Sequence, residues 1–545
     1  MDIKKVNITP FTDQKMGTSG LRKKVEHFMQ EHYLESFVQS VFDTLGADSF
    51  KGKILVIGGD GRYYNKKAIQ IIIKMAVANG WGRLIIGQNG IMSTPAVSLV
   101  IRKYKAEGGF ILSASHNMGG PGKDFGIKYN MSNGSSTPEK VTSAMYETSK
   151  NLSSYTIAEM EDIDISQVSS FSVEGIEINV IDSVADYAEM MQELFDFDAI
   201  KALFKSGFKM KFDAMHAVTG PYAKAIFEGL LGAEEGTVVN CIPKEDFNGG
   251  HPDPNPVYAK ELYDLMMSAY APDFAAASDG DGDRNMVLGK DCFISPSDSL
   301  AVIVDNYQLV KGYKGGILGV ARTLPTSRAL DLVAEKLGVD CYEVPTGWRF
   351  FGTLLDAGKI TFCGEESFGS GSNHIREKDG VWAVLYWLNI IAVRKESAAE
   401  IMHKHWQKYG RHYYCRYDYE AINSNVANDM MAAMREKVTD LAGKKLGERV
   451  VKNAKDFRYV DPVDGYVSEH QGISVEFQDG SRFVVRLSGT GTVGATMRLY
   501  MEKYETAPER LLLNSYTVLS DIAEIAVAFT DVQEKAAKAA PDVIV

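Results

Sequence analysis

One pattern recurs three times along the chain, although the copies share few identical residues. In each copy, apolar strand-like runs alternate with helix-like stretches that end near Gly or Asn, in the order strand, helix, strand, crossover, strand. This order is typical of a mainly parallel sheet covered by helices. We therefore expect three related α/β domains.

The elements of the three copies can be placed by residue range. The first copy has strands at 53–59, 83–87 and 108–115, with a helix up to about residue 79. The second has strands at 208–214, 237–243 and 273–280, with a helix at 221–231. The third has strands at 315–321, 339–345 and 359–366, with a helix at 327–338. The third strand of each copy runs into a polar cluster: SASHN, SDGDGD or GEESFG. Parallel sheets bind ligands beyond the carboxyl ends of their strands, so these clusters mark three equivalent places for a site.

The chain after residue 410 follows a different pattern. Helix-like runs near 426–445 and 508–530 flank a segment, 473–489, that alternates around Asp-Gly as a β-hairpin does, and a further strand is expected at 496–504. This predicts a fourth domain of the α+β class. The expected domains are 1–188, 189–297, 298–410 and 411–545, with a hinge near Tyr409 and Gly410.

Charge and cysteine content limit the classes of partner. The net charge of −12 would repel a phosphodiester backbone, so no nucleic-acid partner is expected. Five scattered cysteines without a CxxC pair do not make a disulfide framework, which favours a reducing cytoplasm.

The charged start does not resemble a secretory signal. The longest uncharged apolar run, 381–393, is too short to span a bilayer and predicts a buried helix, so no membrane partner is expected. The sequence leaves open whether the protein is a monomer or a dimer.

Three aspartates alternate with glycine in SDGDGDRN. Glycine permits a turn tight enough for Asp279, Asp281 and Asp283 to converge on one hard cation. An EF-hand counted from Asp279 fails, because Arg284 and Lys290 stand where that motif needs Gly and Glu. A Mg²⁺ site that keeps room for a phosphate oxygen is the better interpretation, and a solvated acidic turn is the alternative.

Ser115 and His116 stand at the end of an apolar strand, before the glycine-rich stretch GGPGKDFG. A serine on such a turn can act as a nucleophile or as a phosphate carrier, although an ordinary loop serine is the simpler interpretation of Ser115 alone. The DFG triplet does not indicate a kinase, because the chain has no HRD catalytic loop. The absence of GxxxxGK[ST] excludes a P-loop ATPase.

The segment RLSGTGTVGATMR contains a GxGxxG match. A dinucleotide-binding fingerprint must open a helix, whereas the residues that follow here alternate as a strand, so we reject that interpretation. Glycine amides and hydroxyls between Arg486 and Arg498 suit a phosphate monoester instead. A glycine-rich hairpin tip without a ligand is the alternative.

Two further polar tips, VPTGWRFFG and GEESFGSG, belong to the third copy. Glu365 and Ser367 together can accept from and donate to the hydroxyls of a polyol. Without other context, each tip reads as an ordinary loop.

Taken together, these motifs resemble those of the α-D-phosphohexomutase family. GTSGLRKKV, SASHN, DGDGDR, PTGWRFFG, GEESFG and RLSGTGT occur in the family's order from Gly17 to Arg498. GEESFG is similar to the loop of the glucose-specific phosphoglucomutase branch and differs from that of the dual-specificity phosphomannomutases. The resemblance implies three related α/β domains with mixed, mainly parallel sheets and a fourth, phosphate-binding α+β domain, all around a central cleft.

The resemblance also implies a role for each candidate residue. Ser115 would carry the phosphoryl group, with Mg²⁺ between it and Asp279, Asp281 and Asp283. The reacting end would be lined by Arg22, His116, Lys128, Arg284 and Lys378. The substrate would be bound by Thr18, Ser19, Thr346, Gly347, Glu365 and Ser367, and its non-reacting phosphate by Arg486, Ser488, Gly489, Thr490 and Arg498.

The implied reaction interconverts hexose monophosphates. Phosphoserine 115 would phosphorylate glucose 1-phosphate or glucose 6-phosphate, and the resulting glucose 1,6-bisphosphate, which also serves as activator, would turn around and return its other phosphate. Lys128 is our first choice of general base and His116 the second, with Lys378 as partner for the reversed sugar. A phosphomannomutase, another phosphosugar mutase and a non-catalytic phosphorylated scaffold are the alternatives.

Two positions depart from the family's pattern. Met118 stands where relatives commonly have Pro, and Arg349 replaces a Lys. Both changes leave the proposed ligands intact, and we expect them to act on loop rigidity or on affinity.

Overall fold

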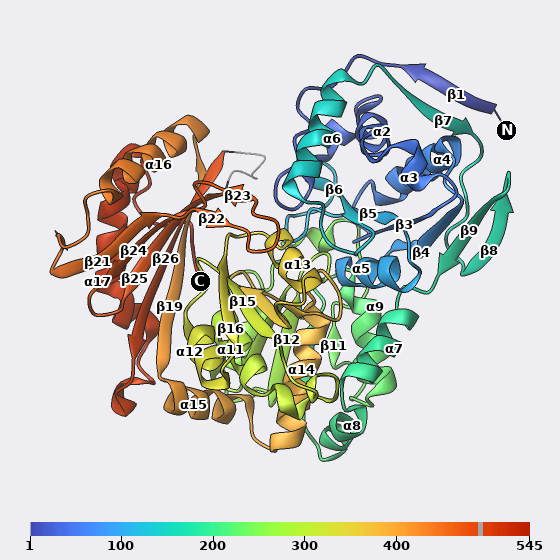
Figure 1. Ribbon diagram of the computed structural model, residues 1–545. Helices are drawn as coiled ribbons and strands as arrows, with labels where there is room; N and C mark the ends of the chain where they lie inside the picture. Colours follow the sequence, from blue (N-terminus) through green and yellow to red (C-terminus); the bar gives the residue numbers. More distant parts are fainter. Residues whose placement is uncertain (1, 489–493) are drawn as a thin grey trace.

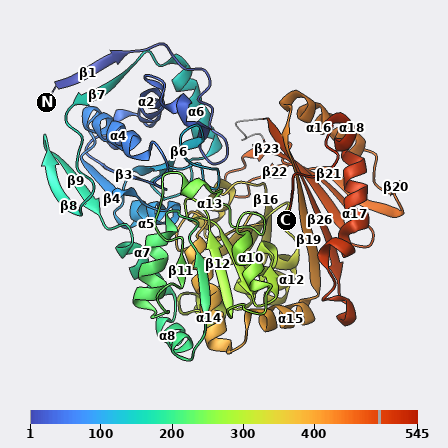
Figure 2. The same cartoon turned by 180° about the vertical axis from the view of Figure 1, so that it is seen from behind.

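The computed structural model describes residues 2–488 and 494–545 of the chain. Figure 1 shows the first unit in blue on one side, the fourth in red on the other, and the second and third between them. The view from behind in Figure 2 shows the same order.

The first unit is built on a seven-stranded sheet with the order β2-β6-β5-β3-β4-β9-β8. Its strands are β2 (Leu21–Lys24), β3 (Ile54–Gly59), β4 (Arg83–Ile91), β5 (Gly108–Leu112), β6 (Asp124–Met131), β8 (Ser169–Val173) and β9 (Ile176–Ile181). β3 pairs in parallel with β4 and β5, whereas β6 runs antiparallel to β5. β1 (Asp2–Asn7) and β7 (Ser154–Glu159) form a separate antiparallel ribbon.

Helices cover both faces of this sheet because its strands are apolar on both sides. Leu55 and Ile57 pack in one core with helices α2 (Tyr33–Leu45) and α4 (Asn65–Asn79). Val56, between them in sequence, packs in another core with α5 (Thr94–Lys103). Alternation along a strand sends neighbouring side chains to opposite faces, which gives the α/β/α layering. Three further helices belong to the unit: α1 (Val25–Phe28), α3 (Ala47–Phe50) and α6 (Glu139–Asn151).

The second and third units have smaller sheets. The second has the order β11-β10-β12-β13-β14, from β10 (Met210–Asp213), β11 (Val238–Val239), β12 (Phe274–Ser278), β13 (Asn285–Gly289) and β14 (Cys292–Ile294). The third has the order β16-β15-β17-β18, from β15 (Gly319–Thr323), β16 (Asp340–Val344), β17 (Phe362–Glu365) and β18 (Gly369–Ser372). Their helices are α7 (Ala185–Leu194), α8 (Phe197–Lys205), α9 (Thr219–Ala223), η1 (Lys224–Leu230), α10 (Lys260–Met266), α11 (Pro296–Asp305), α12 (Ala329–Leu337), α13 (Arg349–Asp356), α14 (Gly380–Arg394) and α15 (Ala398–Tyr409).

All three sheets share one arrangement of four strands. In each copy, the first strand lies between the second and third strands and runs parallel to both. A fourth strand pairs antiparallel with the third. The fourth strands, β6, β13 and β18, were not among the expected elements. Each polar cluster is therefore the turn between a parallel strand and an antiparallel one, and the three turns are equivalent in position.

The fourth unit is a seven-stranded antiparallel sheet, β20-β21-β24-β25-β26-β19-β27. One face of it packs against α16 (Ser424–Val438) and α17 (Ser515–Thr530). Val484 and Tyr500, on the other face, share a core with α13 of the third unit. The remaining elements are β19 (Arg411–Ile422), β20 (Lys445–Leu446), β21 (Arg449–Asp456), β22 (Tyr459–Val460), β23 (Val467–Ser468), β24 (Ile473–Phe477), β25 (Arg482–Ser488), β26 (Ala495–Glu505), α18 (Val532–Lys535) and β27 (Val543–Ile544).

The predicted class, three related α/β units followed by an α+β unit, is confirmed. The hairpin around Asp479 and Gly480 is present, because β24 and β25 pair antiparallel across it. Several boundaries were wrong. The strand expected at 237–243 pairs over two residues, the helix expected at 221–231 is split between α9 and the π-helix η1, and the helix expected from 508 begins at Ser515 after a 3₁₀ turn.

The apolar run at 381–393 forms the buried helix α14, as predicted. Asp379 caps this helix by accepting a hydrogen bond from the Trp382 amide at 3.0 Å. No helix in the described part of the chain has the length and apolarity needed to cross a membrane.

Candidate active site

Ser115 lies in the turn between β5 and β6, with a left-handed backbone (φ 51°) and 2% of its surface exposed. Its amide donates to Ser113 Oγ at 2.7 Å, and its own Oγ donates to Asp279 Oδ2 at 2.8 Å. His116 Nδ1 lies 3.4 Å from the same Oγ. A left-handed conformation is strained for serine, so the surrounding contacts must hold it there.

A buried ion pair lies beneath this turn. Arg62 Nη2 donates to the Ser115 carbonyl at 2.8 Å, and its Nη1 donates to the Asp124 carbonyl at 3.0 Å. Asp60 pairs with Arg62 and accepts from Ser113 Oγ at 2.6 Å. The sequence interpretation missed Asp60 and Arg62. The signal was available, because GGDGR is the polar end of the first strand of the first copy.

The three aspartates occupy the turn between β12 and β13, with their ligand oxygens within 4.8 Å of one another. The Arg284 amide donates to Asp279 Oδ1 at 3.1 Å, and Thr94 Oγ1 donates to Asp281 Oδ2 at 2.7 Å. The Oδ1 atoms of Asp281 and Asp283 are buried without a hydrogen-bond partner among the described residues. Orphaned carboxylate oxygens of this kind are what a bound cation would satisfy.

The electrostatics of the turn also favour a cation. Burial and the charges of Asp281 and Asp283 raise the pKa of Asp279 well above its ordinary value. Burial and the charge of Asp281 raise the pKa of Asp283 to about 6. Against the effect of burial, Lys128, Thr94 and Lys378 lower the pKa of Asp281 to about 2. Three ionised carboxylates repel one another here, and a divalent ion would remove that cost. The donor set therefore fits a hard metal such as Mg²⁺.

Gly280 brings the aspartate turn against the serine turn. A Cβ at this position would lie 2.3 Å from the Ser115 carbonyl oxygen. Only glycine permits so close a backbone approach. The contact between the first and second units, and with it the Ser115–Asp279 bond, depends on this position.

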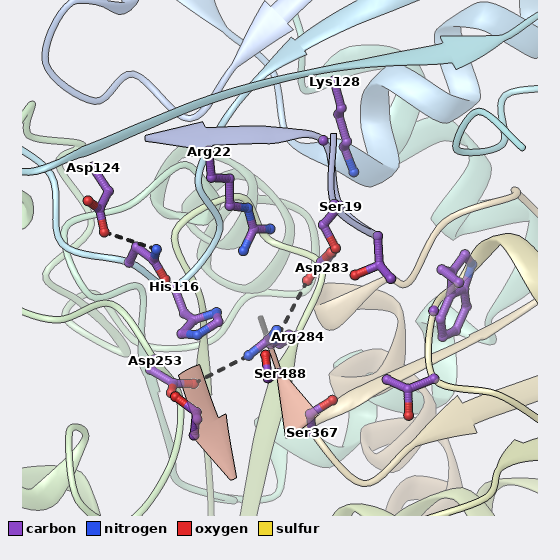
Figure 3. A pocket seen from close by; sticks show the side chains of 18 of the residues that line it. Ser19, Arg22, His116, Asp124, Lys128, Asp253, Asp283, Arg284, Ser367 and Ser488 are labelled. Atoms are coloured by element: carbon purple, nitrogen blue, oxygen red, sulfur yellow. Dashed lines mark hydrogen bonds and ion pairs between the residues drawn. The ribbon is translucent and has the colours of Figure 1, made fainter. Parts of the chain in front are cut away.

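Basic side chains from the first and second units line the same pocket, as Figure 3 shows for Arg22, His116, Lys128 and Arg284. The buried Nε of Arg22 has no hydrogen-bond partner within the described ranges. Burial and the nearby charges of Arg284 and Arg22 lower the pKa of His116 well below its usual value. The imidazole of His116 is therefore neutral. The positive guanidinium groups of Arg22 and Arg284 favour an anionic ligand at this place.

The two candidate lysines are held by carboxylates. Lys128 Nζ lies 3.2 Å from Glu377 Oε1. Lys378 Nζ lies 2.9 Å from Glu365 Oε1 and 3.3 Å from Asp283 Oδ2. Although burial opposes it, these two carboxylates raise the pKa of Lys378, so Lys378 retains its proton and suits a donor better than a base.

The residues expected to contact substrate come from three separate loops. Gly20, with φ 94°, lets the loop of Thr18 and Ser19 pass close to β6, because a Cβ there would lie 2.6 Å from the Ile127 carbonyl oxygen. Thr346 Oγ1 is buried and has no partner among the described residues. Despite burial, the charges of Lys378 and Arg284 and, to a smaller extent, the hydrogen bond of Ser367 hold the pKa of Glu365 below its usual value.

Arg486 and Arg498 face each other across β25 and β26. Arg486 Nη1 donates to Tyr500 Oη at 3.3 Å, and Arg498 Nε lies 3.6 Å from Asp418 Oδ2. The sequence interpretation missed Arg416, whose Nε donates to Asp418 Oδ1 at 2.9 Å. Gly489 and Thr490 lie outside the described residues.

One cleft of about 1,060 Å³ joins these groups. Ser115, Asp279 and Asp281 do not line it and lie buried beneath its floor. The expected residues that line it are Thr18, Ser19, Arg22, His116, Lys128, Asp283, Arg284, Thr346, Gly347, Glu365, Ser367, Lys378, Arg486, Ser488 and Arg498. The cleft also has lining residues that sequence interpretation did not single out, among them Asp124, His251, Asp253, Glu377 and Arg416.

The two departures from the family's pattern have different surroundings. Arg349 Nη2 donates to Glu139 Oε2 of α6 at 2.9 Å, so it bridges the third unit to the first. Met118 lines the cleft, and its carbonyl accepts from the Asp124 amide at 3.1 Å.

Comparisons with known proteins cover nearly the whole chain. Models of phosphoglucomutase/phosphomannomutase α/β/α domains I, II and III match residues 13–156, 185–291 and 296–409, and the model of the phosphoglucomutase-1 C-terminal domain matches residues 411–542. A phosphoglucomutase of Rhizobium radiobacter is 58% identical over 99% of this chain and 100% of its own length. A cytoplasmic phosphoglucomutase of Solanum tuberosum is 51% identical over 99% of each chain. The crystal structure of the open form of Paramecium pp63/parafusin, a phosphoglucomutase, has a TM-score of 0.91 at 46% identity, over 100% of this chain and 99% of its own.

Proposed function

The chain belongs to the phosphoglucomutase/phosphomannomutase family, and from this premise we propose its reaction and the role of each site residue. It is an enzyme of carbohydrate metabolism that interconverts glucose 1-phosphate and glucose 6-phosphate. Ser115 is the phosphoserine, and glucose 1,6-bisphosphate is the intermediate and activator. The observation that carries the assignment of Ser115 is its 2.8 Å hydrogen bond to Asp279, buried beneath the floor of a cleft lined with arginines.

In the first half-reaction, the bond between phosphorus and Ser115 Oγ breaks while a free hydroxyl of the hexose monophosphate bonds to phosphorus. The proton of that hydroxyl leaves to a base, and Ser115 finally regains a hydroxyl proton. Arg22 and Arg284 face the charge that spreads over the transferring oxygens. In the second half-reaction, the bisphosphate has reversed its direction and returns its other phosphoryl group to Ser115.

Asp279, Asp281 and Asp283, together with the Ser115 phosphate, would hold Mg²⁺. When bound, the ion supplies positive charge that neutralises the phosphoryl oxygens. The two orphaned Oδ1 atoms and the raised pKa of Asp279 and Asp283 support this assignment.

Lys128 is the proposed general base for the substrate hydroxyl, and His116 is the second choice. The neutral imidazole of His116, 3.4 Å from Ser115 Oγ, is better placed to exchange a proton with Ser115 itself. Lys378 serves the reversed sugar and, with its raised pKa, gives a proton more readily than it takes one. If Lys128→Met kept near-normal turnover while His116→Gln lost it, this order would be wrong.

The other end of the substrate is bound by the third and fourth units. Thr346, Gly347, Glu365 and Ser367, with Thr18 and Ser19, contact the sugar. Arg486, Ser488, Gly489, Thr490 and Arg498 hold the phosphate that does not react, and we add Arg416 to this set because it lines the same cleft.

The domain division 1–188, 189–297, 298–410 and 411–545 and the hinge at Tyr409 and Gly410 are part of this proposal. Gly410 has φ 79° and joins α15 to β19, the first strand of the fourth unit. We further propose that the protein is cytoplasmic, that it is a monomer or a dimer, and that it binds hexose phosphates but neither nucleic acid nor membranes.

Turnover of glucose 1-phosphate and mannose 1-phosphate, each with Mg²⁺ and a trace of the matching 1,6-bisphosphate, tests the substrate. We expect glucose 1-phosphate to give the higher kcat/KM. A preference for mannose 1-phosphate would favour a phosphomannomutase. Failure to convert either compound would favour a phosphorylated scaffold.

A further inference from the structure

The segment Arg376–Gly380, between β18 and α14, is where the three α/β units meet. Lys378 binds Glu365 of its own unit and Asp283 of the second. Asp379 accepts from the Tyr187 hydroxyl on α7 and caps α14. Glu377, between them, reaches the first unit. The segment thus brings side chains of all three units to the reacting end of the cleft.

Three side chains of the first unit donate to the carboxylate of Glu377. Its Oε1 accepts from Lys128 Nζ at 3.2 Å, from Asn130 Nδ2 at 2.8 Å and from Ser136 Oγ at 2.8 Å. Lys128 and Asn130 are two residues apart on β6, so both point to the same face of the strand. Ser136 is bridged to Asn130. Three donors on one oxygen fix the carboxylate in place.

The pair is buried: Glu377 is 2% exposed and Lys128 is 9% exposed. Within the described residues, Glu377 is the carboxylate that lies within ion-pair distance of Lys128 Nζ. Both side chains line the cleft. The nitrogen of a lysine side chain lies at the end of a flexible four-carbon chain, so its position depends on the partner that holds it.

We propose that Glu377 is a positioning residue for the reaction, which sets where Lys128 Nζ lies at the reacting end of the cleft. The proposal rests on the role assigned to Lys128 in the proposed function. Glu377 thereby couples the third unit, whose loops are proposed to hold the sugar, to the first unit, which carries Ser115. Lys378, the next residue in the segment, is paired with two other carboxylates, Glu365 and Asp283.

Glu377→Gln is the first variant to test. Glutamine retains the size of the side chain and an oxygen that accepts from Asn130 and Ser136, and it removes the charge that holds Lys128. We expect kcat to fall about 10- to 100-fold, as for other residues that orient a catalytic group, while KM changes less than about threefold. The matched control is Asp356→Asn, which removes the charge of the carboxylate that accepts from the neighbouring Arg376 at 2.6 Å and leaves Lys128 untouched. Its kcat should stay within about twofold of the parent.

A double-mutant cycle with Lys128→Met separates positioning from a general structural role. If Glu377 acts through Lys128, Glu377→Gln lowers phosphoryl transfer from Ser115 in the parent and causes little further loss in the Lys128→Met variant. An equal loss in both backgrounds, or a loss confined to KM, would overturn the inference while leaving the proposed function intact. Near-normal turnover of Lys128→Met would overturn both the role of Lys128 and this inference. Absence of any interconversion by the parent would overturn the proposed function itself.

Thermal unfolding of each variant shows whether it folds. If Glu377→Gln does not fold, Asn130→Ala replaces it in the cycle, because it removes one of the three donors on Oε1 without changing a charge. We expect the same direction and a smaller loss of kcat. Unchanged kcat in a folded Asn130→Ala variant would then count against the inference.

Discussion

The three aspartates near Ser115 share one buried turn, and each carboxylate makes the ionisation of its neighbours less favourable. The fold therefore contains an electrostatic strain that a bound cation would relieve. The strain can be measured in single residues, because replacing one carboxylate by its amide changes the charge and preserves the shape.

Asp283→Asn is predicted to stabilise the metal-free protein and to abolish its stabilisation by Mg²⁺. The pKa of Asp283 is raised to about 6, so between about pH 4 and pH 6 the unfolded chain loses a proton that the folded chain retains. Stability of the metal-free protein thus falls as pH rises through this window. At pH 7.5 in EDTA, the variant should be more stable by on the order of 1–3 kcal/mol. Thermal unfolding with EDTA and with Mg²⁺ measures both effects. A lower midpoint in EDTA, or an undiminished shift with Mg²⁺, would contradict the assignment.

His405 is predicted to make the protein sensitive to acid. It is buried on α15, and burial lowers its pKa to about 4, although Asp305 opposes the shift. Since the unfolded histidine has a pKa near 6.5, stability is fully present above that pH and is lost as pH falls toward 4. Between pH 7.5 and 5, His405→Gln should remove about 2 kcal/mol of this loss. The measurement is the thermal midpoint at the two pH values. The exposed His403, on the same helix, supplies the control His403→Gln, and an equal effect of both variants would refute the prediction.

Ser115 and the aspartates, which the structure brings together, could be singled out as candidates from the sequence because they belong to short motifs with their own spacing. Asp60, Arg62 and Glu377 could not be predicted in the same way. Their roles depend on contacts between residues far apart in the chain, such as the bond from Arg62 to the Ser115 carbonyl and that from Lys128 to Glu377. A charged residue at a strand end reads as a solvated turn until its burial is known.

At the scale of elements, the hydrophobic pattern predicted the nine parallel strands of the three copies and missed the antiparallel strand that follows each polar cluster. β18 is Gly369–Ser372 with the sequence GSGS, which carries no apolar alternation, and β6 begins in the DFG triplet. Pairing with a preceding buried strand, rather than local propensity, makes these segments strands. The antiparallel return is what turns each cluster into a tight loop facing the cleft.

Gly280→Ala is predicted to separate the aspartate turn from the serine turn. The added Cβ would lie 2.3 Å from the Ser115 carbonyl oxygen, and backbone atoms on both sides cannot rotate away. We expect a loss of turnover of at least about 100-fold with secondary structure retained, because a displacement of about 1 Å at a reacting group has that effect. Gly229→Ala is the control, since its Cβ would make an ordinary contact at 3.6 Å. Activity and circular dichroism of both variants test the prediction, which fails if Gly280→Ala retains normal turnover.

At the scale of the whole molecule, Glu139 lies where three units come together. It belongs to α6 of the first unit and accepts from Arg349 of the third at 2.9 Å, and, together with burial, its charge raises the pKa of Tyr466 from the β22–β23 loop of the fourth. The guanidinium group of Arg349, one of the two expected departures from the family's pattern, thus reaches across a unit boundary.

Glu139→Ala is predicted to let the fourth unit move away from the first. A partly exposed pair of this kind contributes at most about 1 kcal/mol, so KM for the sugar phosphate should rise about two- to fivefold with kcat nearly unchanged. Small-angle scattering should give a larger radius of gyration for the variant. Glu147→Ala, on the same helix and paired with Lys150 within it, should leave both quantities unchanged. A fall in kcat at constant KM would contradict a role in closing the cleft.

The phosphorylation of Ser115 is the measurement that tests the account most directly. The protein is incubated with Mg²⁺ and glucose 1,6-bisphosphate, the modified residue is located by mass analysis, and glucose 1-phosphate is then added. We predict one phosphoryl group on Ser115, its transfer to the added sugar phosphate, and turnover by Ser115→Ala below about one-thousandth of the parent. Phosphate found on another residue, or normal turnover by Ser115→Ala, would contradict the account.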